Sequence, residues 1–311
     1  MAPHHHHHDH HAPATFAQGN QSNQIRLYIF CILLNLLFVG VEAGVGFWQD
    51  SLSLLSDAGH NLSDVFSLVL VLIAFQLARV HPHGHYTYGL KKSTILISLL
   101  NAILLLVAVG GIVVESIHKF NTPVEVNGTA ISWTAGIGIL INGLTALLLL
   151  RGSQADLNQK GAYLHMVADT LVSVGVVFSG ILINLTGWNI VDPIVSLIIA
   201  VVILGSTWSL LTDSLRLIID GTPEGVEPEA IEQIMTAIDG VSSIHHLHIW
   251  AISTTDNALT AHVVVNELDR MEQIKDLLKQ QLHAAGIAHA TLEFETAGSH
   301  CHDHECQNET C

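Results

Sequence analysis

The chain has 311 residues, of which 50% are hydrophobic and only 12% are charged. A composition this apolar excludes an ordinary soluble domain and predicts a membrane protein. Acidic residues outnumber basic ones by 27 to 11, which argues against a nucleic-acid partner because phosphates need a basic surface. The acids, together with 22 histidines, favour binding of a cation.

Residues 1–24 form a histidine-rich tail that opens with MAPHHHHHDHH. We expect a flexible cytosolic arm that collects metal ions, although an affinity tag would give a similar run. No signal-peptide pattern precedes the first apolar segment. Three of the four cysteines crowd the C-terminal end among histidines, so a secreted disulfide framework is not expected and a reducing cytosolic setting fits better.

Residues 25–215 contain apolar segments long enough to cross about 30 Å of hydrocarbon as helices, which takes roughly 20 residues each. We expect six transmembrane helices, at Ile25–Trp48, Leu52–Ala78, Ser93–His118, Thr129–Leu150, Ala162–Thr186 and Ile190–Leu211. Only Lys119 lies near the helix ends on one side, and the other basic residues lie on the opposite side. The positive-inside rule therefore places both termini in the cytosol.

Residues 216–297 change to the character of a soluble domain. The first segment, EPEAIEQIMTAIDG, has helical spacing, and the next two, SIHHLHIWAIST and ALTAHVVVNEL, alternate like strands. A second amphipathic helix and a third strand follow. The order αββαβ predicts a cytosolic α+β, ferredoxin-like domain after the helical membrane domain. Residues 298–311 are a second tail, rich in cysteine and histidine.

Polar residues interrupt the second and fifth expected spans. His60 and Asp64 are four residues apart in SLLSDAGHNLSDV, and His165 and Asp169 repeat the spacing in YLHMVADT. Residues at i and i+4 share one helix face, so each helix offers one imidazole and one carboxylate. Four such ligands suit a tetrahedral Zn²⁺.

Alternative roles for these polar residues are interhelical hydrogen bonds, buried salt bridges or proton transfer alone. Salt bridges are disfavoured because no Lys or Arg occurs between Arg26 and Arg79. Carboxylates in a membrane without a fixed cation need a mobile one. Asp57, one turn before His60, is a proton-coupling candidate or a helix cap, and Glu42 in the first span is either functional or an interhelical hydrogen-bonding group.

SLSLLSDAGHNLSDV, the HMVADT segment, six spans and an αββαβ tail together resemble the zinc-transporting branch of the cation diffusion facilitator family, over about residues 25–296. The resemblance implies a homodimer that exports Zn²⁺ from the cytosol in exchange for protons by alternating access. It also implies a transport site of His60, Asp64, His165 and Asp169.

Further metal sites are expected in the loops, the cytosolic domain and the tail. The resemblance implies regulatory zinc in the cytosolic domain, where a polar sheet face is the alternative; the candidate ligands are His245, His262, Glu293 and Glu295. Loop metal in some relatives suggests a site at His81, His83 and His85, although a solvated loop is the simpler reading. The tail offers His300, Cys301, His302, His304 and Cys306, soft and borderline ligands suitable for zinc.

The function predicted is therefore a Zn²⁺/H⁺ antiporter, in a bacterial inner membrane. Imidazole and carboxylate bind metal only when deprotonated, so protons compete with zinc. An ATP-driven pump is not expected, because neither GxxxxGK[ST] nor DKTGT occurs. The alternatives are a broader exporter of Cd²⁺ and Co²⁺, a membrane metal sensor without transport, and an intramembrane metalloenzyme. The metalloenzyme would need a general base beside the ligands, and no H-E-x-x-H occurs.

Overall fold

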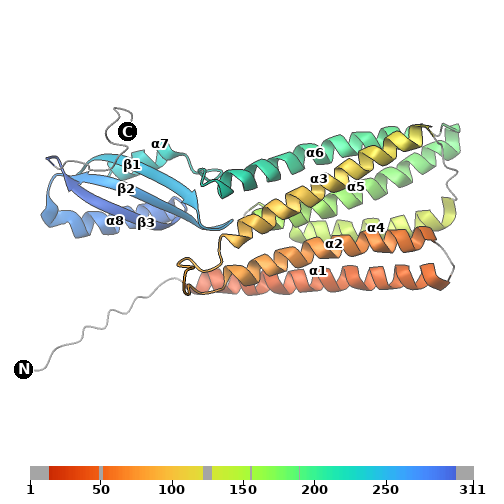
Figure 1. Ribbon diagram of the computed structural model, residues 1–311, viewed down its shortest axis with the longest axis horizontal. Helices are drawn as coiled ribbons and strands as arrows, with labels where there is room; N and C mark the ends of the chain where they lie inside the picture. Colours follow the sequence, from red (N-terminus) through yellow and green to blue (C-terminus); the bar gives the residue numbers. More distant parts are fainter. Residues whose placement is uncertain (1–13, 49–51, 122–127, 155, 189, 299–311) are drawn as a thin grey trace, which may run out of the picture. The chain divides into compact units, whose positions relative to one another are not determined.

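The computed structural model describes residues 14–48, 52–121, 128–154, 156–188 and 190–298. By its contacts the chain divides into two compact units, residues 1–72 and residues 73–311. The first unit contains helix α1 (Ala14–Trp48) and helix α2 (Leu52–Ala78) up to Leu72. The second contains the end of α2, four further long helices and a small sheet with its own helices (Figure 1).

Helix α1 has one buried stripe. Its buried side chains follow a spacing of three and four residues, as expected when one face of a helix packs and the other does not. The stripe is mainly apolar but includes an asparagine and a glutamate; its members are Tyr28, Cys31, Asn35, Phe38 and Glu42. Polar groups buried on such a face need hydrogen-bond partners, which the neighbouring helix can provide.

The long helices of the second unit are α3 (Ser93–Asn121), α4 (Gly128–Leu149), α5 (Leu157–Thr186) and α6 (Val191–Ile218). Helix α5 is in contact with the other three, and α3 also packs along α6 (Figure 1). A Cβ at Gly175 of α5 would lie 2.4 Å from Cδ1 of Ile199, so α5 and α6 approach closely there, and a larger residue would displace the Ile199 side chain. Helix α5 is therefore held between packed neighbours.

Three stretches of the described residues are long and apolar enough to cross a membrane by length and composition: Ile25–Val45, Ser93–His118 and Pro193–Ile218. Shorter apolar stretches lie in α2 and α4, at Asp64–Ala78 and Gly136–Leu149. The expected helical character of the membrane domain is thus confirmed. The count of six spans and the orientation of the termini stay predictions.

Several helices are longer than the spans expected from sequence. Helix α1 begins at Ala14 instead of Ile25, α5 begins at Leu157 instead of Ala162, and α6 continues to Ile218 instead of Leu211. The difference arises because apolarity marks the part of a helix that fits hydrocarbon, whereas the helix itself continues until a cap or a breaker ends it.

The C-terminal α+β domain has the predicted order αββαβ. It consists of α7 (Pro228–Thr236), β1 (Val241–Ala251), β2 (Asn257–Val265), a single 3₁₀ turn at Leu268–Arg270, α8 (Met271–Ala284) and β3 (Ile287–Thr296). The strand order in the sheet is β1-β2-β3. Strands β1 and β2 are antiparallel, whereas β2 and β3 are parallel. The parallel pairing is possible because α8 returns the chain to the edge of the sheet at which β2 begins, so β3 runs in the same direction as β2.

One face of this sheet is covered. The amphipathic helices α7 and α8 contribute buried residues four apart, and β2 contributes alternate residues to the same core, as strand geometry requires. The set includes Ile231, Met235, Leu259, Ala261, Val263, Ile274, Leu278 and Leu282. His262 of β2 alternates with these core residues, so it lies on the opposite face.

Candidate metal sites

His165 and Asp169 lie one turn apart on α5 and form what we call the α5 pair. Nε2 of His165 is 3.7 Å from Oδ2 of Asp169. Both residues are buried, with exposed fractions of 7% and 9%. The predicted i, i+4 arrangement is therefore present locally: one imidazole nitrogen and one carboxylate oxygen converge inside a packed helical segment.

Lysine and arginine are confined to the first turn of α5. Lys160 is the one lysine or arginine in the sequence of α5, and its Nζ is 3.0 Å from Oδ2 of Asp213 on α6. A carboxylate taken out of water is costly unless it is paired, protonated or bound to a metal. The arrangement of Asp169 beside an imidazole can therefore accept either a proton or a divalent cation.

The start of α5 is fixed by a hydrogen-bonded aspartate, which sequence reasoning missed. Oδ1 of Asp156 accepts hydrogen bonds from the backbone N–H groups of Asn158 (2.8 Å) and Gln159 (3.0 Å). These bonds satisfy amide groups that a helix N-terminus leaves unpaired. The signal was available, because an aspartate followed three residues later by glutamine is a helix-start pattern.

Asp156 also joins α5 to the C-terminal domain. The hydroxyl of Thr254, in the β1–β2 loop, donates to Oδ2 of Asp156 at 2.6 Å, and the backbone N–H of Thr254 donates to Oγ1 of Thr94 at 3.1 Å. Nearby, Nζ of Lys91 is 2.7 Å from Oδ2 of Asp256. The β1–β2 loop is thus bonded to the first turns of α3 and α5.

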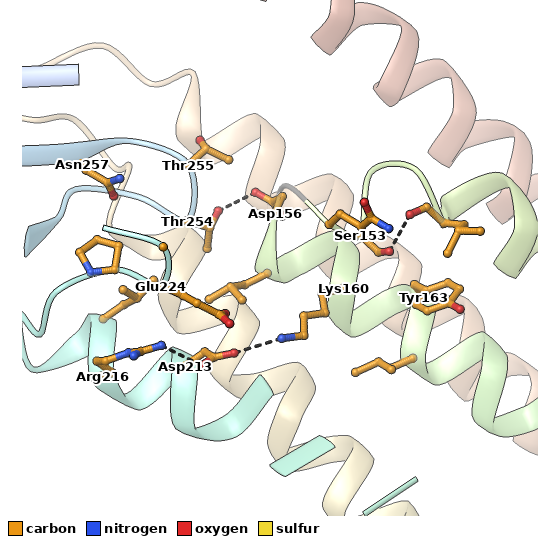
Figure 2. A pocket seen from close by; sticks show the side chains of 17 residues that line it. Ser153, Asp156, Lys160, Tyr163, Asp213, Arg216, Glu224, Thr254, Thr255 and Asn257 are labelled. Atoms are coloured by element: carbon orange, nitrogen blue, oxygen red, sulfur yellow. Dashed lines mark hydrogen bonds and ion pairs between the residues drawn. The ribbon is translucent and has the colours of Figure 1, made fainter. Parts of the chain in front are cut away.

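A cavity of about 670 Å³ lies beside this junction. Figure 2 shows the Thr254–Asp156 bond on one side of it and, on the other, Asp213 between Lys160 and Arg216. Nη2 of Arg216 donates to Oδ1 of Asp213 at 3.0 Å. Both cations therefore share one carboxylate, and the cavity carries positive and negative groups together.

On α2, Asp64 is fully buried and Asn61 is partly buried. The side-chain amide of Asn61 donates to Oε2 of Glu42 at 2.7 Å, so Glu42 is an interhelical hydrogen-bond partner between α1 and α2. The side chains of Asp57 and His60 lie outside those that the structure describes. That Asp64 and His60 form one site with the α5 pair stays a prediction.

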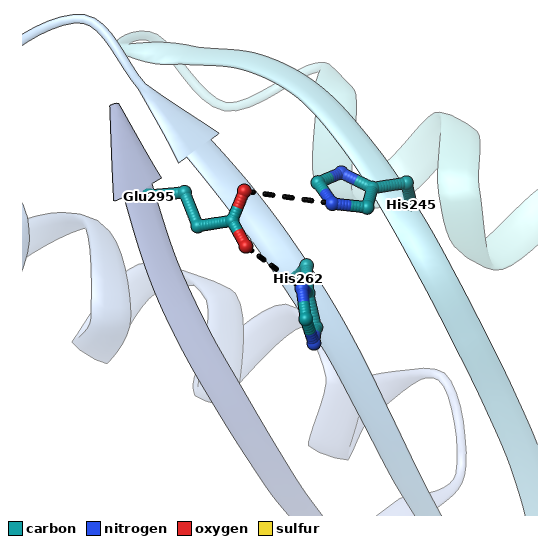
Figure 3. A group of neighbouring side chains, drawn as sticks. All are labelled: His245, His262 and Glu295. Atoms are coloured by element: carbon teal, nitrogen blue, oxygen red, sulfur yellow. Dashed lines mark hydrogen bonds and ion pairs between the residues drawn. The ribbon is translucent and has the colours of Figure 1, made fainter. Parts of the chain in front are cut away.

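His245, His262 and Glu295 form a second group, which we call the sheet cluster. Its three ligand atoms lie within 4.8 Å of one another. Oε1 of Glu295 is 2.8 Å from Nδ1 of His262, and Oε2 of Glu295 is 3.5 Å from Nε2 of His245 (Figure 3). The register explains the grouping, because His245 of β1 is paired with His262 of β2 and Glu295 follows two residues after the partner of His262 on β3.

Glu293 is that partner, and it lies at the edge of the cluster. Its Oε2 is 3.6 Å from Nε2 of His262, and its side chain is 68% exposed, against 11% for Glu295. The two glutamates therefore flank opposite nitrogens of one imidazole. Of the two, Glu295 is the better placed to share an ion with both histidines, because both of its oxygens face them.

The loop histidines are described, and they are solvent-exposed. Nδ1 of His83 is 2.9 Å from the carbonyl oxygen of His81, and the ring of His83 contacts that of Tyr86. Within the described part of the chain, His81, His83 and His85 do not belong to a group of three converging ligands. The loop site stays a prediction. The tail ligands lie outside the described residues.

The comparisons with known proteins cover nearly the whole chain. The model of the cation efflux transmembrane domain matches residues 28–219, and that of the cation efflux protein cytoplasmic domain matches residues 223–296. A cadmium, cobalt and zinc/H(+)-K(+) antiporter of Bacillus velezensis is 37% identical over 299 residues, which are 94% of this chain and 95% of the relative.

Two further relatives come from other bacteria. The zinc transporter ZitB of Yersinia pestis is 35% identical over 93% of this chain and 92% of its own length. The metal cation efflux system protein CzcD of Cupriavidus metallidurans is 35% identical over 84% of this chain and 83% of its own. Because both domain models match and together span residues 28–296 apart from a short gap, the chain belongs to the cation efflux family, the cation diffusion facilitators.

Proposed function

We propose that this protein exports Zn²⁺ from the cytosol in exchange for protons, by alternating access. The observation that carries the proposal is the α5 pair, an imidazole nitrogen and a carboxylate oxygen 3.7 Å apart in a buried part of a membrane-domain helix. The relative from Yersinia pestis is named a zinc transporter and that from Bacillus velezensis a cadmium, cobalt and zinc/H(+)-K(+) antiporter, and these names support both the ion and the coupling to protons.

The cargo site we propose consists of His60 and Asp64 of α2 with the α5 pair. Two nitrogens and two oxygens match the tetrahedral coordination of zinc. Mg²⁺ and Mn²⁺ prefer oxygen ligands in octahedral arrangements, so they are poor cargo for such a site. Asp64 is fully buried, which suits a ligand that a cation or a proton must neutralise.

Coupling follows from the chemistry of the ligands. Imidazole and carboxylate must lose their protons to bind zinc and regain them when zinc leaves. A site open to the acidic side therefore releases zinc and loads protons, and a site open to the cytosol does the reverse. The packed helices of the membrane domain would rock between the two arrangements, as in other secondary transporters. Asp57 is the proposed proton acceptor beside the site.

A broader range of cargo is the second candidate. The Bacillus relative is named for cadmium and cobalt as well as zinc. Both ions accept nitrogen and oxygen ligands, so Cd²⁺ and Co²⁺ are proposed as secondary cargo. Transport, in place of sensing or catalysis, is favoured for this chain because relatives matched over most of their length are named as transporters.

The cytoplasmic domain would hold a resident regulatory zinc in the sheet cluster, with Glu293 as an outer partner. The donor set fits, because two imidazoles and a carboxylate are ordinary zinc ligands. The protein would act as a homodimer in the bacterial inner membrane with both termini in the cytosol. The tails and the loop histidines would collect ions for transport.

Zinc flux into proteoliposomes tests the proposal. Purified full-length protein is reconstituted, zinc is placed outside, and the pH inside is set below the pH outside. Zinc should accumulate inside above its external concentration, and a proton ionophore should abolish the accumulation. A channel would only equilibrate zinc, and a sensor or a metalloenzyme would move none, so either result would contradict antiport.

A further inference from the structure

Strand β1 contains a bulge beside the sheet cluster. His245 is paired with His262, whereas His248 is paired with Thr260, so β1 advances by one residue more than β2 over this stretch. Within it, His246 has a φ of 51°, in the left-handed region that residues other than glycine seldom adopt. Bulges of this kind redirect a side chain, and they are frequent beside functional sites.

The bulge changes which face of the sheet His246 occupies. Ile244 and Ile249 are buried in the domain core, and Leu247 packs against the same core. With strict alternation, His246 would share the core face of Ile244. The extra residue instead shifts the alternation by one, so that two consecutive histidines, His245 and His246, lie on the face opposite the core.

The three imidazoles have the spacing expected around one metal ion. Ring centres are 5.0 Å apart for His245 and His262, 5.1 Å for His246 and His262, and 5.6 Å for His245 and His246. With a metal about 2.0–2.1 Å from each nitrogen, imidazoles at a tetrahedral angle have centres about 5.2 Å apart. His248 is different, because its ring centre is 6.2 Å from that of His246 and it lies beyond the bulge.

We infer that His246 is a third imidazole ligand of the sheet cluster, which then binds a zinc-type divalent ion through His245, His246, His262 and Glu295. Rotation of the His246 ring about its side-chain torsions would direct a nitrogen toward the other three ligand atoms. Three nitrogens and one carboxylate oxygen complete a tetrahedral shell without a water ligand, as in structural zinc sites. The inference rests on the ion proposed for this cluster, and not on zinc transport.

The strained backbone supports the assignment. A left-handed residue that is not glycine persists where the surrounding structure requires it, and such positions cluster at ligand-binding sites. Histidine is among the residues that tolerate this region better than most, as asparagine is. The substitution His246→Asn should therefore keep the backbone conformation and remove only the imidazole, so that it tests the imidazole as a ligand.

Metal binding to purified full-length protein tests the inference, with Asp169→Asn present in every sample so that the proposed cargo site contributes little. Four proteins are compared: this background alone and the background with His246→Asn, with His245→Ala or with His248→Asn. The readouts are the visible absorption of bound Co²⁺, which is intense only for tetrahedral coordination, and the competition of Zn²⁺ against a chromophoric chelator.

His246→Asn and His245→Ala should each weaken zinc at one site by more than about 10-fold, since even the loss of an outer partner of a metal ligand costs 10- to 100-fold. Both should also reduce the tetrahedral cobalt absorption, and His248→Asn should leave both readouts unchanged. If His245→Ala lowers affinity but His246→Asn does not, the cluster binds metal without His246 and the inference is wrong. If neither changes it, the proposed resident ion is wrong as well.

Chemical modification of the unsubstituted protein gives a second test that does not depend on the folding of a variant. Diethyl pyrocarbonate modifies imidazoles that hold no metal, and mass spectrometry locates the modified residues. Zinc should protect His245, His246 and His262 together, while His248 stays reactive. Reactivity of His246 that is equal with and without zinc, beside a protected His262, would overturn the assignment.

Discussion

The α5 pair and the sheet cluster bring together the same kinds of side chain, imidazole and carboxylate, but are assembled in different ways. His165 and Asp169 are neighbours because one helical turn separates them, and both are buried in a helix packed among α3, α4 and α6. The sheet cluster unites three strands through their register, and its histidines face away from the domain core. A pair on one helix can be carried by the motion of that helix, whereas a cluster across a sheet is held by the whole sheet.

This difference suggests which ion moves. A cargo site must lose its ion in each cycle, so it should take its ligands from helices that can rearrange. A resident ion needs ligands whose positions are fixed together, which a hydrogen-bonded sheet provides. The four predictions that follow test this assignment of cargo to the α5 pair and residence to the sheet cluster.

The largest effect is expected from Asp169→Asn, which keeps the size of the side chain and removes its charge. Zinc flux in proteoliposomes should fall to the level of protein-free vesicles, because a neutral amide neither replaces the carboxylate ligand nor exchanges a proton. The matched control is Val174→Ala on the same helix, at a position 44% exposed, which should transport normally. Wild-type flux in Asp169→Asn would remove the α5 pair from the cargo site.

A change of selectivity is expected from His60→Asp, which replaces nitrogen by oxygen and keeps the i, i+4 relation to Asp64. The variant should still transport zinc but discriminate less against cadmium, because an added carboxylate permits bidentate and higher-coordinate binding that the larger ion accepts. Competition of Cd²⁺ against Zn²⁺ flux at one pH measures this. An unchanged ratio would show that selectivity is set elsewhere.

A smaller effect is expected from Thr254→Val, which removes the hydroxyl bonded to Asp156. Hydrogen bonds to charged groups contribute about 1.5–3 kcal/mol, so the thermal midpoint of the purified protein should fall. The β1–β2 loop joins the two strands that carry His245 and His262, and it is bonded to the start of α5. Any dependence of transport on zinc in the sheet cluster should therefore weaken in this variant.

Thr255→Val is the matched control for the loop, because the Thr255 hydroxyl is 3.3 Å from that of Ser253 within the same loop. It should leave the dependence of flux on zinc concentration as in the wild type. If both variants lose the dependence of flux on zinc concentration equally, the loop as a whole has been disturbed. If neither variant changes it, the bond from Thr254 to Asp156 does not couple the sheet cluster to transport.

The smallest effect on transport is expected from Glu295→Gln. The substitution removes the carboxylate that lies near both histidines of the sheet cluster, so zinc affinity at that cluster should fall by about 10-fold or more. Flux at saturating zinc should nevertheless remain, because the cargo ligands are untouched. Complete loss of flux in a folded protein would mean that the sheet cluster, too, takes part in moving the cargo.

Local spacing predicted much of this molecule. The i, i+4 relation of His165 and Asp169 could be derived from sequence because a helix fixes it within one turn. The order αββαβ followed from periodicity, and α7 and α8 bury the residues that their spacing indicates. The sequence also indicated the histidines of β1 and β2 as neighbours, since antiparallel strands joined by a short loop pair closely.

Features that depend on tertiary contacts were not predictable in the same way. The bulge at His246 breaks the alternation expected for SIHHLHIW. The sequence alone does not show which of the two adjacent histidines will have its side chain moved to the other face of the sheet by a bulge. The polar first turn of α5 was excluded from the expected span because it is not apolar, although Asp156 caps it. The hydrogen bond from Thr254 to Asp156 joins residues 98 apart in sequence, and a local sequence pattern does not predict such a contact.

The most direct test of the central claim measures proton movement driven by zinc alone. Vesicles containing the protein start with equal pH inside and outside and an internal pH dye, and zinc is then added outside. Inward zinc should drive protons outward, so the interior should become more alkaline, and Asp169→Asn should abolish the change. If zinc enters wild-type vesicles without any change of internal pH, the transport is not coupled to protons and the account of the cargo site is wrong.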